Sequence, residues 1–69
     1  RLVGIGAGNL DVNGVPVADS NLTQALAPLM GKPTDMLILR GRDGADLQRI
    51  TDVTGLLRQA GYSNFVLVE

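Results

Sequence analysis

The sequence has 69 residues, of which 45% are hydrophobic and 19% are charged, and its formal net charge is −1. This length and composition predict one folded domain over residues 1–69 and exclude a two-domain mechanism. With neither cysteine nor histidine, the chain cannot form disulfides and lacks thiol and imidazole chemistry and the preferred zinc ligands. One tyrosine, one phenylalanine and a near-neutral charge argue against a nucleic-acid partner.

A domain this small is expected to be marginally stable, because the entropy lost on ordering nearly offsets what apolar burial contributes. Small domains are usually reinforced by disulfides, metals or association, so we expect a second polypeptide chain to assist this one. Its hydroxyl groups lack a histidine base, and an enzyme would depend on carboxylates alone. We therefore expect no enzymatic activity, no cofactor and no metal.

The first seventeen residues have the pattern of a small antiparallel sheet. Apolar positions alternate over residues 3–7 and 10–12, on either side of a Gly-Asn pair at 8–9, which predicts a β-hairpin. An Asn-Gly pair at 13–14 predicts a second tight turn, since this dipeptide tolerates two positive φ angles. The Val-Pro-Val segment at 15–17 is expected to be at most a short edge strand, because Pro16 cannot donate a ladder hydrogen bond.

A first helix is predicted after this sheet. Asp19 and Ser20 are N-cap residue types, and Pro28 is expected to end or bend the helix. The apolar face of the helix has the spacing i, i+3, i+4, i+7 and consists of Leu22, Ala25, Leu26 and Leu29.

The second half predicts strand, helix and strand. Residues 36–39 and 65–68 are short apolar runs typical of central strands buried on both faces. Between them, Asp43 and Asp46 are expected to cap a helix that ends at Gly61. Its apolar stripe consists of Leu47, Ile50, Val53, Thr54, Leu57 and Ala60. Short connections predict a right-handed βαβ crossover with parallel strands.

The predicted fold is α+β: a ββαβαβ two-layer sandwich with two helices on one face of a small mixed sheet and a C-terminal right-handed βαβ unit. The predicted core consists of Leu22, Leu26, Leu29, Ile38, Ile50, Val53, Leu57 and Leu67.

Two motifs have competing interpretations. Gly4, Gly6 and Gly8 resemble the start of a dinucleotide fingerprint, but no helix follows to receive a pyrophosphate, so we expect hairpin glycines that permit a close backbone approach. The aspartates at 43 and 46 beside arginines at 40 and 42 suggest a carboxylate or cation site, but helix capping with ion pairs at the solvent edge is the simpler expectation.

Several segments together resemble a known family. Residues 8–17, Gly-Asn-Leu-Asp-Val-Asn-Gly-Val-Pro-Val followed by a helix, resemble the opening of the periplasmic domains of ExbD/TolR biopolymer-transport proteins. Residues 37–43, Leu-Ile-Leu-Arg-Gly-Arg-Asp, are similar to that family's strand ending in Arg-Ala-Asp. Residues 57–62, followed by an apolar strand, are similar to its Ala-Gly-hydrophobic entry to the last strand. The likeness extends over essentially the whole chain.

The resemblance implies the periplasmic domain of a bacterial inner-membrane single-pass protein, with the given chain a fragment and the membrane helix upstream. It implies the output end of a proton-driven motor that works as a homodimer with an ExbB/TolQ-like channel subunit. TonB- or TolA-like energy transducers, or peptidoglycan, are the implied partners. The alternative function is a small-ligand-sensing, ACT-like regulatory domain with a sheet of the βαββαβ style.

The expected partner surface is a sheet edge, since an unpaired edge offers backbone donors and acceptors to an extended segment. The alternative is that Pro16 blunts this edge against aggregation. The predicted partner-binding residues are Leu10, Asp11, Val12, Asn13, Gly14, Val15, Pro16 and Val17.

Overall fold

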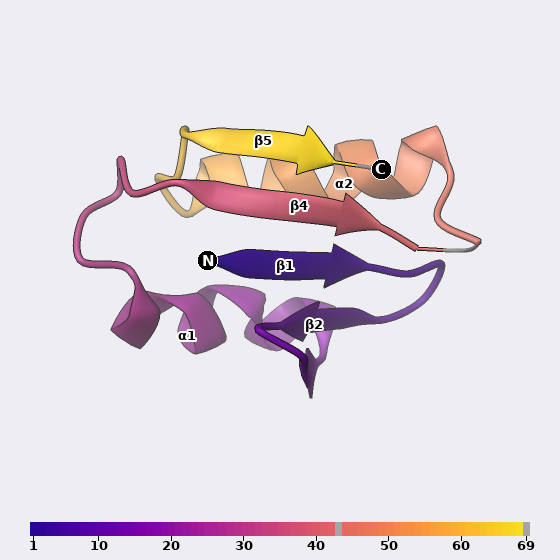
Figure 1. Cartoon of the computed structure of the whole chain (residues 1–69), viewed down its shortest axis with the longest axis horizontal. Helices are drawn as coiled ribbons and strands as arrows, with labels where there is room; N and C mark the ends of the chain where they lie inside the picture. Colours follow the sequence, from indigo (N-terminus) through magenta and orange to yellow (C-terminus); the bar gives the residue numbers. More distant parts are fainter. Residues whose placement is uncertain (43, 69) are drawn as a thin grey trace.

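A computed structural model describes residues 1–42 and 44–68 and contains one five-stranded sheet (Figure 1). Its strands are β1 (Leu2–Ile5), β2 (Leu10–Val12), β3 (Val15–Val17), β4 (Leu37–Gly41) and β5 (Phe65–Val68). They lie in the order β3-β2-β1-β4-β5, with β3 and β5 at the edges. The pairs β1–β2 and β2–β3 are antiparallel, whereas β1–β4 and β4–β5 are parallel.

The helices pack on one face of this sheet, which confirms the predicted α+β sandwich. They are η1 (Asp19–Asn21), α1 (Leu22–Leu26), η2 (Ala27–Leu29) and α2 (Leu47–Gln59). Figure 1 shows α2 passing behind β4 and β5, so the chain makes the predicted right-handed crossover between these parallel strands. The Val-Pro-Val segment forms β3, which makes the full element order βββαβαβ.

The two hairpins differ in their turns. The Asn-Gly pair is the expected two-residue turn, with φ of 51° at Asn13 and 86° at Gly14 and Val12 opposite Val15. The first hairpin is closed by a longer loop than predicted. Residues 6–9 all lie between the strands, and the Gly6 N–H donates to the Asn9 carbonyl at 2.9 Å.

The core lies between the helices and the sheet face that they cover. Its fully buried apolar residues are Val3, Ile5, Leu10, Val12, Leu22, Leu26, Leu37, Leu39, Val53 and Leu57, with Tyr62 at their margin. Leu29 and Ile50, also predicted for the core, pack against it while partly buried. Because successive strand residues point to opposite faces, only alternate residues of β4 reach this core.

Two core predictions were therefore wrong. Ile38 is 38% exposed because it points to the face without helices, and Leu67 is 50% exposed because β5 is an edge strand. The same geometry overturns the expectation that both apolar runs are buried on both faces, since β4 is covered on one side and β5 is largely exposed.

Helix α2 follows its sequence signals closely. The carboxylate of Asp46 accepts a hydrogen bond from the Arg49 backbone N–H at 2.9 Å, which confirms this residue as the N-cap. The partner cap, Asp43, lies outside the described residues. Gly61 follows the helix with φ of 95°, a typical C-terminal conformation. Leu47 is 78% exposed, so the buried stripe starts one turn later than predicted.

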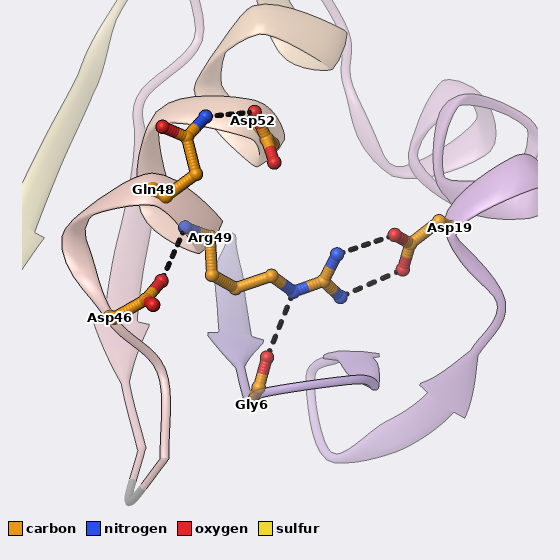
Figure 2. A network of polar contacts seen from close by, with 6 residues as sticks. All are labelled: Gly6, Asp19, Asp46, Gln48, Arg49 and Asp52. Atoms are coloured by element: carbon orange, nitrogen blue, oxygen red, sulfur yellow. Dashed lines mark hydrogen bonds and ion pairs between the residues drawn. The ribbon is translucent and has the colours of Figure 1, made fainter.

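Arg49 fastens α2 to the first half of the chain (Figure 2). Its Nε donates to the Gly6 carbonyl at 2.9 Å, and its guanidinium forms a two-pronged ion pair with Asp19, one bond of which is 2.8 Å. Asp19 makes no side-chain cap at the first helix, which corrects its predicted capping role. The ion pair instead joins η1 to α2 across 30 residues of sequence.

Candidate functional site

The predicted partner strip divides into a buried part and an exposed part. Residues 10–12 form β2, which lies between β1 and β3, and all three are buried. The main chain of Leu10, Asp11 and Val12 is therefore paired on both sides and is not available to a partner strand. Asp11 and Val12 still line two surface hollows. Residues 13–16 are exposed and Val17 is partly buried. A strand that pairs at this edge can reach only the main chain of the Asn-Gly turn and β3.

The main chain of β3 is a poor template for another strand. In a two-residue hairpin the closing pair, here Val12 and Val15, exchanges both of its hydrogen bonds, so the next residue outward is Pro16. Proline offers a carbonyl but no N–H. The free side of this three-residue strand therefore lacks the donor that pairing needs, as expected if Pro16 blunts the edge.

An apolar groove of about 300 Å³ lies beside β3, between this strand and the first helix. It is lined by Val12, Asn13, Val15, Val17, Ala25 and Leu29. The groove offers side-chain contacts where the main chain offers little pairing.

The opposite edge, β5, is better suited to pairing. The Leu37 N–H donates to the Asn64 carbonyl at 2.9 Å, so the main-chain polar groups of Asn64 point toward β4. Because strand residues alternate, Phe65 and Leu67 direct both N–H and C=O outward. No strand among residues 1–42 and 44–68 pairs on that side. The β5 edge thus presents donors and acceptors along with exposed apolar side chains.

The sequence does not reveal this edge, because residues 65–68 have the composition of a buried strand. Nothing local in these four residues distinguishes an edge strand from a central one. The guanidinium of Arg58 lies over the Phe65 ring, 5.4 Å from its centroid, and holds that side chain against α2.

A polar hollow lies on the face of the sheet without helices. It measures about 450 Å³ and is lined by Leu2, Gly4, Asp11, Arg40, Gly41 and Arg42. Asp11 accepts a hydrogen bond from the Gly4 N–H at 3.1 Å and pairs with Arg42. The Asp11 side chain is 11% exposed, so this ion pair is partly withdrawn from water. Arg42 was predicted to pair with the aspartates near the helix start; within the described residues its ion pair is with Asp11 and not with Asp46, and Asp43 lies outside them.

Gly4 is required by these side chains. A Cβ atom there would lie 2.5 Å from Asp11 Oδ1 and 2.9 Å from Arg42 Nε. The close approach predicted for the N-terminal glycines therefore occurs, but it is made by side chains and not by another backbone. Gly4 and Gly6 belong to β1 and its loop, and no helix begins there, so the dinucleotide interpretation has no structural basis.

The ion pair of Asp19 with Arg49 shifts the pKa values of both groups. The hydrogen bond from Arg49 lowers the pKa of Asp19 below its ordinary value of 3.8, and the same bond raises the pKa of Arg49. Arg49 is the more enclosed partner, with its side chain 14% exposed against 44% for Asp19. This pair stabilises the fold and touches neither sheet edge.

Comparisons add little to this geometry. No family model matches the chain, and no curated protein is detectably similar to it in sequence. Among the described residues, no three acidic side chains gather as metal ligands, and no helix has the length and apolar character needed to cross a bilayer.

Proposed function

We propose that this chain is the periplasmic output domain of an inner-membrane proton-driven motor of the ExbB-ExbD or TolQ-TolR type. It transmits the energy of the proton-motive force to a TonB- or TolA-like partner, for outer-membrane transport or envelope integrity. The order of the sequence motifs supports the proposal, as does a mixed sheet with both helices on one face. The observation that carries it is the unpaired β5 edge, where the main-chain N–H and C=O groups of Phe65 and Leu67 point away from β4.

An extended linker segment of the transducer adds to β5 as a further strand. Outward N–H and C=O groups at Phe65 and Leu67 supply the backbone bonds, and Val66, Leu67 and Val68 supply exposed apolar contacts. Backbone pairing tolerates many sequences, which suits a domain that acts on a linker rather than on a folded surface. This places the partner at β5, at the other side of the sheet from the strip predicted from sequence.

Self-association is the second part of the proposal. A small domain held at a membrane by an upstream helix meets its copy at a high effective concentration, so a weak contact is enough. The ExbB/TolQ-like channel subunit would bind that helix, and peptidoglycan remains a further partner implied by the resemblance. Crosslinking of the membrane-anchored protein is expected to trap a homodimer, and its absence would contradict this part.

The ACT-like alternative is less well supported. Its sheet style predicts the order βαββαβ, whereas this chain has the order βββαβαβ with three consecutive strands at its start. The Asn-Gly hairpin that adds β3 has no place in that order.

Titration of the ¹⁵N-labelled domain with synthetic linker peptides of TonB- and TolA-like proteins tests the proposal. We expect the amide resonances of residues 65–68 to move first. Shifts centred on residues 13–17 would instead place the partner at β3 and overturn the β5 assignment. Shifts confined to residues 40–46 would contradict capture at either edge.

A pair of variants separates backbone pairing from side-chain contact. Leu67→Pro removes one outward N–H, the group that Pro16 also lacks on the free side of β3, and is expected to abolish peptide binding. Leu67→Ala keeps the N–H and is expected to retain most of the affinity. Equal loss in both variants would show that the Leu67 side chain, not its backbone, binds the linker.

A further inference from the structure

The open face of the sheet carries an apolar row beside the polar hollow. Leu2 lies opposite Ile38, and Ile38 lies opposite Val66. Paired residues on neighbouring strands project to the same face, so these three side chains stand next to one another. Each is more than a third exposed.

Directly beside this row lies a charged one. Gly4 is opposite Arg40 in the register of β1 and β4, two residues along each strand from the apolar pair. Arg42 follows β4 and extends to Asp11 on the far side of Gly4. One side of the hollow is therefore bordered by the apolar Leu2, and the other side is bordered by Arg40 and Arg42.

The charges of the hollow are unequal. Two guanidinium groups and one carboxylate line it, and the carboxylate of Asp11 is already engaged by Arg42 and by the Gly4 N–H. The Arg40 side chain makes no hydrogen bond or ion pair with any residue of 1–42 and 44–68. Counting only residues 1–42 and 44–68, the lining carries a net positive charge, and the Arg40 donors border a space that Leu2 walls with aliphatic carbon.

Gly4 and Gly41 both line the hollow, and Gly4 leaves room for the Asp11 and Arg42 side chains to meet, because a Cβ there would lie 2.5 Å from Asp11 Oδ1. A guanidinium presents its donors in a planar fork that matches a carboxylate, and its weak hydration favours such pairing at a partly enclosed site.

We propose that this hollow binds an aliphatic carboxylate. The carboxylate lies between Arg40 and Arg42, and the branched aliphatic group next to it packs on Leu2 and Ile38. A free acid and the C-terminal end of an extended peptide share this chemistry. The site is on the face opposite the helices and does not rest on the motor proposal, although Val66 of β5 borders the same apolar row.

Titration of the ¹⁵N-labelled domain with N-acetylvaline, followed by heteronuclear NMR, tests this inference. We expect the amide resonances of Gly4, Gly41 and Arg42 to shift at millimolar concentration. N-acetylvaline amide has the same shape without the charge, and is expected to bind at least about tenfold more weakly. Equal shifts from the acid and the amide would overturn the proposal.

Two further ligands define the chemistry. Inorganic phosphate carries charge without an aliphatic group and is expected to bind more weakly than N-acetylvaline; equal or tighter binding overturns the aliphatic part. A glycine-rich tetrapeptide ending in a free valine carboxylate distinguishes the two sources. Tighter binding than N-acetylvaline assigns the site to a peptide end, and weaker binding assigns it to a free acid.

Arg40→Gln is the variant of choice, because Arg40 is exposed and its loss leaves the Asp11 ion pair intact. We expect about tenfold weaker binding of N-acetylvaline. Lys32→Gln is the matched control, since it removes one positive charge from the exposed segment before β4 and is expected to leave binding unchanged. Equal affinity in the Arg40→Gln and wild-type domains, with both spectra showing folded protein, would overturn the site.

Discussion

The two faces of the sheet are built by opposite means. On the covered face, Val3, Ile5, Leu37 and Leu39 are completely buried by helices α1 and α2. On the open face, the neighbouring positions hold glycine, an ion pair and half-exposed aliphatic residues. Apolar burial therefore determines stability on one face, whereas the other holds Arg42 paired with Asp11 and the exposed Arg40.

The largest expected effect is on the covered face. Leu57→Ala removes a completely buried side chain of α2 and is expected to lower the free energy of unfolding by about 2–5 kcal/mol. Urea denaturation followed by circular dichroism measures this change. Leu47→Ala is the control on the same helix, and its exposed side chain predicts a change below about 0.5 kcal/mol. Similar losses in both variants would contradict the assigned helix face.

A smaller loss is expected at the open face. Asp11→Ala removes the carboxylate partner of Arg42 and the side-chain acceptor of the Gly4 N–H, which is expected to cost about 1–3 kcal/mol. The same urea experiment measures it. Asp11→Asn keeps an acceptor for Gly4 and is expected to lose less than the alanine variant. A neutral result for Asp11→Ala would show that the ion pair contributes nothing to folding.

The contrast between the faces also explains which features were predictable. Alternation, the Asn-Gly pair, the Asp46 cap and the stripe of α2 are local signals, and they predicted every major element and the parallel crossover. Local sequence does not determine which faces of a strand the rest of the protein covers. Residues 36–39 therefore appeared buried on both faces, although only alternate residues of β4 meet the helices.

Neither ion pair could be predicted from sequence spacing. Asp19 and Arg49 lie 30 residues apart and meet only because η1 and α2 pack on one face. Asp11 and Arg42 meet across Gly4, whose missing Cβ is the only sequence feature that hints at the contact. The outward-facing residues of β5 likewise depend on the register with β4.

The Asp19–Arg49 pair, which belongs to the covered side, predicts a pH dependence. Arg49 lowers the pKa of Asp19 in the folded state, so the pair stabilises the fold above the ordinary Asp19 pKa of 3.8. That stability is lost as pH falls through the lowered pKa. Asp19→Asn is therefore expected to be less stable than wild type near pH 7, by at most about 1 kcal/mol for a pair this exposed.

Urea denaturation of both proteins from neutral to acidic pH measures this difference, which should vanish once Asp19 of the wild type is protonated. Salt at about 1 M should also reduce it near pH 7, because exposed charges are then screened over about 3 Å. A difference that persists unchanged at low pH would show that the carboxylate charge is not what Arg49 recognises.

The smallest expected effect on stability is at Ile38, and it separates the two faces most directly. Ile38→Thr keeps a β-branched side chain on β4 and is expected to change the free energy of unfolding by no more than about 0.5 kcal/mol, because Ile38 lies outside the core. Leu39, the next residue of the same strand, is completely buried, so Leu39→Ala is expected to lower the free energy of unfolding by about 2–5 kcal/mol. If the open face binds an aliphatic carboxylate, Ile38→Thr weakens N-acetylvaline binding although it barely changes stability. Unchanged binding together with unchanged stability would leave the apolar row without a role in that site.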